Sequence, residues 1–275
     1  VYAAWVADRM ADPRQSAAWR KRIWLLFSAV FFGQLFLGLA GASRFLMSGK
    51  LHLPVPALIV AGPIYRGEGF FMPILFATTL LIVGPAWCSH LCYIGSWDLL
   101  ASTAQRRAAP LPGWREPSRV GVLVLVVLGA LGLRLLGAGH AVALSAGALF
   151  GLGGVAVMAF ASRRTGAMVH CTLWCPMGLI AAVAGRLSPF RIRVGARCNR
   201  CNVCARACRH DALGPEAISR GRPGLSCTLC GDCVAACPSR QLQYRWLWLE
   251  PATARALFVT LVAALHAVFL GLARL

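Results

Sequence analysis

Eight of the twelve cysteines in the chain lie in two runs that share one spacing. The runs are Cys198-x2-Cys201-x2-Cys204-x3-Cys208 and Cys227-x2-Cys230-x2-Cys233-x3-Cys237, and Pro238 follows the second run. A cubane [4Fe–4S] cluster needs four thiolate ligands, whereas a tight C-x2-C-x2-C loop supplies only three. Two complete runs of four cysteines therefore predict two [4Fe–4S] clusters. Structural zinc is the alternative, although zinc motifs usually present separated cysteine pairs rather than complete runs.

The two runs resemble those of bacterial two-cluster ferredoxins, in which the last cysteine of each run binds the other cluster. On this pattern the cluster I set is Cys198, Cys201, Cys204 and Cys237. The cluster II set is Cys208, Cys227, Cys230 and Cys233. Arg209 stands where a proline would follow the first run, and this departure removes no ligand.

Charged residues are distributed unequally between the two runs. Arg197, Arg200, Arg206, Arg209 and His210 lie in or beside the first run, whereas the second contains Asp232. Nearby positive charge stabilises the reduced, more negative form of a cluster. Our hypothesis is that cluster I has the higher reduction potential. The alternative is that these cations form a solvated face that contacts lipid headgroups.

The remaining cysteines form two C-x3-C pairs, and each pair follows an apolar run. The four cysteines are Cys88, Cys92, Cys171 and Cys175. A glycine follows each pair at the same distance, Gly95 in one and Gly178 in the other, so the two segments form an internal repeat. Residues four apart on a helix share a face, and two such pairs around a pseudo-two-fold axis could bind a third iron–sulfur cluster, [4Fe–4S] or [2Fe–2S]. The alternatives are free thiols in helix contacts and a redox disulfide.

Composition indicates an integral membrane protein, because 58% of the residues are hydrophobic and the mean hydropathy is +0.66. The formal charge of +19 alone would also suit a nucleic-acid partner. The arginines instead flank apolar runs, and no soluble basic domain with interleaved aromatic residues is present, so we predict no nucleic acid. Twelve cysteines, all within metal-binding motifs, indicate a reducing compartment for the two long runs.

Five apolar runs are predicted to cross the membrane, and the fold class is therefore a mainly α polytopic helical bundle with a small α+β ferredoxin-like domain. The runs are 23–47, 70–87, 120–136, 141–161 and one that begins near Ala252. The shorter segment 51–62 contains Pro54 and Pro56 and is predicted to be interfacial or re-entrant. The predicted parts are a cytoplasmic N-terminal segment (1–22), a membrane bundle with both C-x3-C motifs (23–188), the ferredoxin domain (189–245) and a C-terminal membrane helix (246–275). Arginine clusters at the ends of the runs predict a multi-pass protein of the bacterial inner membrane with its ferredoxin domain in the cytoplasm.

The motifs together resemble the membrane-bound polyferredoxins. The second pair reads Cys171-Thr-Leu-Trp-Cys175-Pro176, the C-x3-C-P motif of that family, and the first reads Cys88-Ser-His-Leu-Cys92-Tyr93, with tyrosine in place of proline. The resemblance covers roughly residues 24–241. The family includes the quinol-oxidising subunit of periplasmic nitrate reductase, the nitrous oxide reductase regulator type and a copper reductase of oxidase assembly. The compact nitrate-reductase type is the most similar of these.

The resemblance and the clusters imply an electron relay between a cytoplasmic or quinol donor and a membrane or periplasmic redox partner. The chain would be an electron-transfer subunit of an oxidoreductase complex, with the lipid bilayer and other subunits of that complex as its partners. No set of residues resembles a nucleophile or a general base, so no catalytic residue is predicted. The alternatives are a copper-reducing assembly factor and an anchoring subunit with structural clusters. A quinone could bind beside the cysteine pairs, near His90, Tyr93, Asp98 and His170, or at the opposite face near Tyr65, Arg66 and Glu68.

Overall fold

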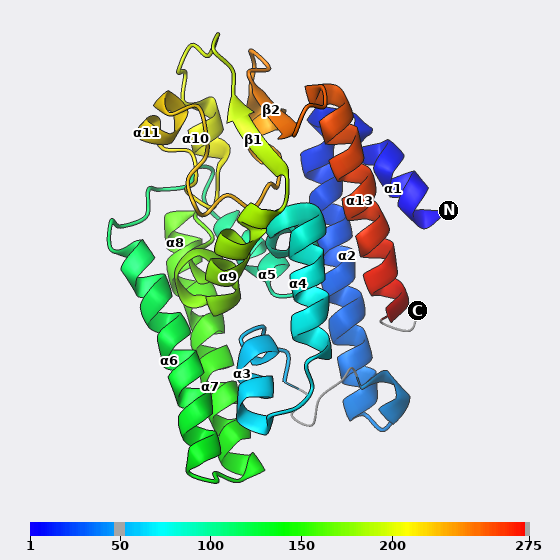
Figure 1. The fold of residues 1–275 in the computed structure, drawn as a ribbon, viewed down its shortest axis with the longest axis vertical. Helices are drawn as coiled ribbons and strands as arrows, with labels where there is room; N and C mark the ends of the chain where they lie inside the picture. Colours follow the sequence, from blue (N-terminus) through cyan, green and yellow to red (C-terminus); the bar gives the residue numbers. More distant parts are fainter. Residues whose placement is uncertain (47–52, 273–275) are drawn as a thin grey trace.

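The computed structural model describes residues 1–46 and 53–272. It consists of a bundle of helices that carries a small, mostly irregular domain with a two-stranded sheet at one end (Figure 1). On one side of the bundle α1 and α13 run next to each other (Figure 1). The predicted fold class, a helical membrane bundle with a small α+β domain, is confirmed.

The elements follow the chain in a simple order. The longer helices are α1 (Tyr2–Ala11), α2 (Pro13–Leu39), α3 (Leu58–Arg66), α4 (Phe71–Val83), α5 (Gly95–Ser102), α6 (Arg115–Leu135), α7 (His140–Val157), α9 (Pro176–Ala184) and α13 (Pro251–Leu272). The short helices are α8 (Arg163–Thr165), α10 (Val203–Ala207), α11 (Pro215–Ser219) and α12 (Asp232–Ala236), and the strands are β1 (Phe190–Val194) and β2 (Leu242–Trp246). Short 3-10 and π-helical turns, including Trp87–Leu91 and His170–Trp174, connect several of these helices.

Five helices in the described part of the chain are long and apolar enough to cross a membrane, as predicted. They are Pro13–Leu39, Phe71–Leu91, Arg115–Leu135, His140–Thr165 and Pro251–Gly271. The first begins ten residues before the apolar run, because Asp12 caps it by accepting a hydrogen bond from the Arg14 amide and Pro13 occupies its first turn. The predicted end of this run at residue 47 lies outside the described residues, as do the first two residues of segment 51–62. The rest of that segment leads into α3, which is too short to cross.

The sheet pairs the residues that precede the first cysteine run with those that follow the second. β1 and β2 are antiparallel, with Phe190 opposite Trp246. Alternate side chains face one side of a strand, and on this sheet Phe190 and Tyr244 are buried on the same side. Both pack on Phe258 of α13, with ring centroids 5.3 Å and 4.8 Å away. The sheet thus closes the polar domain into a unit and attaches it to α13.

α13 has two kinds of neighbour along its length. Its first half covers the sheet, whereas Phe269 near its end packs on Phe27 of α2 and on Trp87 at the end of the second candidate span. α1 lies along it, and Arg255 donates hydrogen bonds to the carbonyls of Met10 and Ala11. Helix α1 and the first half of α13 therefore form one hydrophobic core with the polar domain.

Candidate iron–sulfur sites

The two C-x3-C pairs adopt the same backbone conformation. Each pair lies on a π-helical turn, closed by a hydrogen bond from the Cys92 amide to the Trp87 carbonyl (3.0 Å) in one and from the Cys175 amide to the His170 carbonyl (2.8 Å) in the other. The second cysteine of each turn is extended, with φ −82° and ψ 117° at Cys92 and φ −80° and ψ 116° at Cys175. The pairs were predicted to lie on continuous helices. The π turn replaces these and ends in an extended residue, a local distortion that is common at functional sites.

The repeated glycines are required by this turn. A Cβ at Gly95 would lie 2.9 Å from the Cys88 carbonyl oxygen, and one at Gly178 would lie 2.4 Å from the Cys171 carbonyl oxygen. Contacts this short exclude any larger residue unless the backbone moves. Each glycine therefore lets the helix that follows pack against the first cysteine of its own pair. One difference remains between the halves: α9 begins directly at Pro176, whereas α5 begins only at Gly95, because Tyr93 takes the place of the proline.

The four cysteines of the two pairs lie in one place, which we call the paired-cysteine site. Burial raises the pKa of Cys171, and the charges of Asp98, Cys92, Cys175 and Cys88 raise it further, so all three other sulfurs act on this one. Burial also raises the pKa of Cys175 to about 12, opposed by the backbone N–H groups of Gly178 and Met177. Buried thiols of this kind become thiolates when a metal cofactor supplies the compensating positive charge.

Backbone amides face the sulfurs at equivalent positions in the two turns. The N–H groups of Ile94 and Gly95 stabilise the thiolate of Cys92 as those of Met177 and Gly178 do for Cys175, although burial raises the pKa of both. Hydrogen bonds of this kind to cysteine sulfur are among the features that set the potential of an iron–sulfur cluster. The two halves thus present matched thiolates with matched donors.

Three side chains that the cysteine pattern does not mark hold the paired-cysteine site together. The Trp24 indole N–H of α2 donates to the Cys92 carbonyl (2.6 Å), and the Arg119 guanidinium of α6 donates to the Gly178 carbonyl (2.9 Å). Asp98 of α5 is fully buried and accepts a hydrogen bond from the Cys171 amide (2.9 Å). Burial raises the Asp98 pKa to about 6. Asp98 therefore links the first half of the repeat to the second.

The cluster II set lies together around one small cavity. Cys208, Cys227, Cys230 and Cys233 all line it, with Ile192 and Leu213 among the apolar walls. The Ala212 amide donates to the Cys208 sulfur (3.3 Å), the kind of donor that cluster-bound thiolates accept. The structure therefore brings the fourth cysteine of the first run to the first three of the second. The assignment of Cys208 to cluster II stays a prediction, with which this placement is compatible.

The contacts of the cluster I set join three of its four members. Burial raises the pKa of Cys204, and the charges of Cys237 and Cys198 raise it further. Cys201 is exposed, and its amide donates to the Asn199 side chain (3.3 Å). Cluster I would therefore lie at the surface of the domain, whereas the cluster II set lies between the sheet and the bundle.

A buried ion pair connects the cluster II loop to the bundle. Arg20 of α2 donates to both carboxylate oxygens of Asp232, at 3.3 Å and 2.7 Å, and to the Ser89 carbonyl at 3.0 Å. The Ser89 hydroxyl in turn donates to the Thr228 carbonyl (2.9 Å). Ser89 directly follows Cys88, and Thr228 directly follows Cys227. One hydrogen bond therefore joins a ligand segment of the paired-cysteine site to a ligand segment of the cluster II set.

The charges lie differently from what their order in the sequence suggests. Arg197, Arg200 and Arg206 are exposed to solvent. Arg209 points toward the bundle and donates to the carbonyls of Ser102, Gly166 and Gln105. His210 lines the cluster II cavity, where burial lowers its pKa to about 4. Because solvent screens the exposed arginines and Arg20 lies beside the cluster II loop, the charge argument for a higher potential at cluster I loses its structural basis.

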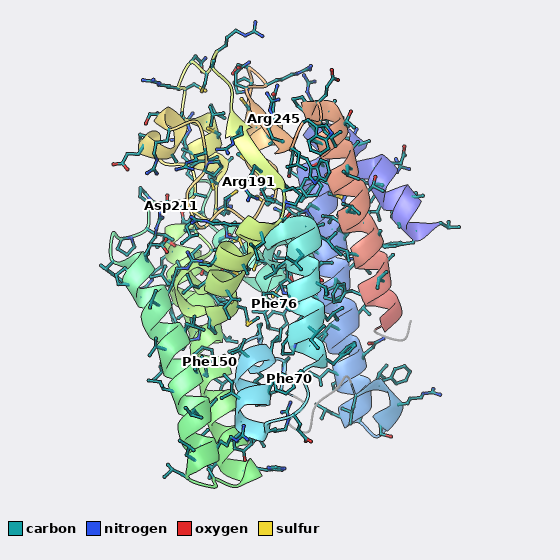
Figure 2. The ribbon with its side chains drawn as sticks, viewed as in Figure 1. Phe70, Phe76, Phe150, Arg191, Asp211 and Arg245 are labelled. Carbon is teal, nitrogen blue, oxygen red and sulfur yellow. The ribbon has the colours of Figure 1, made fainter. Side chains whose placement is uncertain are left out.

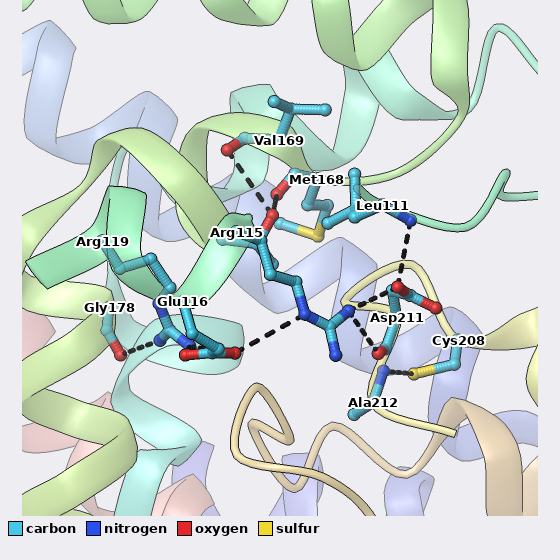
Figure 3. A network of polar contacts seen from close by, with 11 residues as sticks. Leu111, Arg115, Glu116, Arg119, Met168, Val169, Gly178, Cys208, Asp211 and Ala212 are labelled. Carbon is cyan, nitrogen blue, oxygen red and sulfur yellow. Dashed lines mark hydrogen bonds and ion pairs between the residues drawn. The ribbon is translucent and has the colours of Figure 1, made fainter. Parts of the chain in front are cut away.

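A second polar network fastens the first run to α6 (Figure 3). Asp211 accepts a hydrogen bond from the Leu111 amide (3.0 Å) and forms an ion pair with Arg115, which also donates to the Asp211 carbonyl (3.0 Å). Glu116 lies between Arg115 and Arg119, and Arg119 continues the network to Gly178 (Figure 3). The loop beyond Cys208 is thus held in register with the paired-cysteine site.

The donor chemistry suits iron–sulfur clusters better than single ions. In the described part of the chain, no three His, Cys, Asp or Glu side chains converge closely enough to hold one metal ion. Four cysteines in one group are instead the ligand number of a [4Fe–4S] cluster. Two of the three groups each contain four cysteines in mutual electrostatic contact or around a common cavity.

Comparison with known proteins agrees with this chemistry. A family model described as a 4Fe-4S binding domain matches residues 68–101 and 144–195, the two segments that contain the C-x3-C turns. Together with the five apolar helices, this match defines a multi-pass iron–sulfur membrane protein. A protein of Escherichia coli (strain K12), described as a candidate electron transport protein, YccM, is 24% identical over 219 residues. The alignment covers 70% of this chain and 59% of that protein. No solved structure matches significantly.

Proposed function

We propose that the chain is a membrane electron relay that carries two [4Fe–4S] clusters in its polar domain and a third iron–sulfur cluster at the paired-cysteine site. The hydrogen bond from Ser89 to the Thr228 carbonyl carries this proposal, because it joins segments that contain Cys88 and Cys227. The relative described as an electron transport protein supports the same class of function. The division into a membrane bundle (23–188) and a ferredoxin domain (189–245) belongs to the proposal.

When bound, iron–sulfur clusters supply one-electron carriers that need no acid or base. The chain fixes their positions. Cys198, Cys201, Cys204 and Cys237 would hold cluster I at the surface, and Cys208, Cys227, Cys230 and Cys233 would hold cluster II against the bundle. Cys88, Cys92, Cys171 and Cys175 would hold the third cluster at the ends of two membrane helices. In the last two sets Cys88, Cys208 and Cys233 are buried and the other cysteines are half-buried, which restricts the access of water to the reduced state.

The order of the three sites gives the direction in space of the relay. Cys201 of the cluster I set is exposed, and the cluster II loop is hydrogen-bonded to the segment of Cys88, so in our proposal cluster II lies between cluster I and the third cluster. Electrons would therefore pass between a soluble donor or acceptor at cluster I and the membrane through cluster II. The arginine-rich loops support a position of the polar domain in the cytoplasm, and we propose a bacterial inner-membrane protein with a membrane or periplasmic redox subunit as partner.

The test is the amount of iron and acid-labile sulfide per chain in anaerobically purified protein. The Cys88→Ser, Cys171→Ser double variant removes two ligands of the paired-cysteine site and leaves the other two sets intact. We expect about ten to twelve irons in the wild type and about eight in this variant, since each [4Fe–4S] cluster holds four. A Cys227→Ser variant serves as the matched control and should lose iron from cluster II without losing the third cluster.

About eight irons in the wild type and in the double variant alike would refute the third cluster. The paired cysteines would then carry out thiol chemistry, and a metal-reducing assembly factor would fit better. Electron flux that survives Cys227→Ser in an assembled complex would instead favour an anchoring subunit with structural clusters. Both alternatives keep the ligand sets of the polar domain.

An apolar pocket beside the paired-cysteine site favours a quinone or quinol as the membrane reactant. Its volume is about 370 Å³, and Phe32, Val155 and Trp97 line it together with His170 and Cys175. Neither ring nitrogen of the buried His170 has a hydrogen-bond partner among the described residues. A carbonyl or hydroxyl of a quinone ring would satisfy one of them, and the apolar walls suit an isoprenoid tail.

The quinone site can be tested by reducing the clusters with a short-chain quinol and following their visible absorbance. A His170→Leu variant should be reduced at least about tenfold more slowly while its iron content stays at the wild-type level. Dithionite reduction of the same variant provides the control for cluster integrity. Equal quinol rates in the two proteins would exclude His170 from the reaction and return the quinone to the opposite face near Tyr65.

A further inference from the structure

A hollow at the junction of the bundle and the polar domain is lined by arginines. Its volume is about 490 Å³, and the five arginines are Arg186, Arg191, Arg193, Arg220 and Arg222. They come from three segments: the 3-10 turn Gly185–Leu187 after α9, strand β1 and the turn after α11. Pro85 and Gly185 form the side of the hollow toward the bundle, and Cys227 lies on the side toward the polar domain.

The positive charge of this hollow is not neutralised within the chain. No Asp or Glu lines it, and no ion pair is formed by any of the five arginines among the described residues. Burial lowers the pKa of Arg191, and repulsion by Arg193 and Arg186 lowers it further. Arg191 is held in place by its own neighbours, since it donates to the carbonyls of Ser188, Phe190 and Arg186. The hollow is thus a preformed site for a negatively charged group.

An exposed apolar belt borders the same hollow. The Ser188 hydroxyl donates to the Ile82 carbonyl (3.5 Å), which places the end of α9 against the end of α4. Around this contact, Leu81, Ile82, Val183 and Leu187 expose 41% to 73% of their surface. Residues 71–91 form a candidate membrane span, so the belt faces the hydrocarbon region and the arginines lie directly beyond its polar edge. Figure 2 shows Arg191 on strand β1, above the helices of the bundle.

We propose that the hollow binds the phosphate headgroup of an anionic phospholipid, whose acyl chains lie along the belt. Arginine recognises phosphate through paired N–H donors, and basic pockets at the ends of membrane helices are known to bind such headgroups. A zwitterionic lipid fits less well, because its ammonium group would lie among unneutralised arginines. This inference does not depend on electron transfer or on the third cluster.

The test compares binding of phosphatidylglycerol and phosphatidylcholine with the same acyl chains, measured by native mass spectrometry of the full-length protein released from detergent. The Arg186→Gln, Arg220→Gln, Arg222→Gln variant removes three exposed arginines of the hollow. We expect wild-type protein to prefer phosphatidylglycerol by at least about tenfold, and the variant to lose that preference. The matched control, Arg197→Gln, Arg200→Gln, Arg206→Gln, removes the same charge from the first cysteine run and should keep the preference.

Equal loss of preference in both triple variants would overturn the proposal, because it would show attraction to total charge rather than to this hollow. Retention of the preference by the hollow variant would overturn it as well. Inorganic phosphate is the second probe, and we expect it not to displace phosphatidylglycerol. Displacement by phosphate alone would show that a soluble phosphate is the ligand and would overturn the lipid assignment. If the hollow variant does not fold, the wild-type comparison decides, and equal affinity for the two lipids overturns the proposal.

Discussion

The ion pair between Arg20 and Asp232 gives the sharpest prediction about how the polar domain is held on the bundle. The side chains are only 2% and 14% exposed, and their charged atoms are 2.7 Å apart. At an effective dielectric constant of about 20, such charges attract each other by about 6 kcal/mol, part of which is offset by desolvation. Removing one partner of a buried pair costs about 3–5 kcal/mol, since the other charge is left unpaired.

We therefore expect Arg20→Met to lower the stability of the apoprotein by about 3–5 kcal/mol. This corresponds to a fall of roughly 10 °C in the apparent melting temperature in detergent. Arg22→Met is the matched control in the same helix. Arg22 is exposed and stacks over Trp19 at 4.7 Å, a contact that contributes about 0.5–1 kcal/mol.

A double-mutant cycle distinguishes the ion pair from the packing of the Arg20 side chain. Asp232→Asn in the Arg20→Met background removes the unpaired carboxylate and should restore part of the lost stability, with a coupling energy of about 2 kcal/mol or more. Additive effects of the two substitutions would contradict our reading of the pair. So would equal destabilisation by Arg20→Met and Arg22→Met.

Three further changes test the connections around the cysteines. Ser89→Ala removes the hydrogen bond to the Thr228 carbonyl and should lower the free energy of unfolding by about 1 kcal/mol. It should also slow reduction of the third cluster after rapid mixing with a one-electron reductant, while the iron content stays unchanged. An unchanged rate would show that this hydrogen bond is not part of the electron-transfer path. Gly178→Ala places a methyl group against the Cys171 carbonyl, so it should lower the iron content as far as the Cys88→Ser, Cys171→Ser variant does. A wild-type iron content would show that the backbone of the turn can move to accept the methyl group. Arg115→Gln breaks a partly exposed ion pair with Asp211, so the free energy of unfolding should fall by no more than about 1 kcal/mol. Hydrogen exchange should increase only in segments 105–115 and 208–213. Faster exchange throughout the polar domain would show that the ion pair stabilises the whole domain.

The periodic and local features of the sequence predict much of this fold. Five apolar runs predict five candidate spans, and the two cysteine runs predict a small separate domain. The start of α2 could have been predicted earlier in the chain, because Asp12 and Pro13 form a helix-start signal that the apolar run hides. The equivalence of the two C-x3-C turns also follows from the shared spacing of their cysteines and glycines. Their π-helical conformation does not follow from this spacing, because it depends on which carbonyl accepts the hydrogen bond from the amide of the second cysteine.

The long-range partners of the cysteines could not be predicted in the same way. Arg20 precedes Asp232 by more than two hundred positions, and in the sequence it belongs to a cluster of cations that simply marks a membrane boundary. His210 follows the first run but lies in the cavity of the second, since the crossing of Cys208 carries its neighbours with it. The charged residues that are near a cysteine run in the sequence are therefore only partly those that lie near the corresponding cysteine set in space.

The contacts of Asp98 and Ser89 show how the two halves of the internal repeat differ in their attachment to the rest of the chain. Each half of the repeat supplies two cysteines, but the support differs: Asp98 of the first half binds the Cys171 amide of the second, whereas Ser89 binds the cluster II loop. Two turns with identical contacts would not differ in how they contact the polar domain. Thr172 stands at the equivalent position in the second half, but its hydroxyl donates to the Met168 carbonyl (2.7 Å), so only the Ser89 hydroxyl of the first half reaches the cluster II loop. The paired-cysteine site thus contacts the cluster II loop through Ser89, while His170 and Cys175 border the apolar pocket, and this arrangement is the one that our proposed relay to a membrane reactant requires.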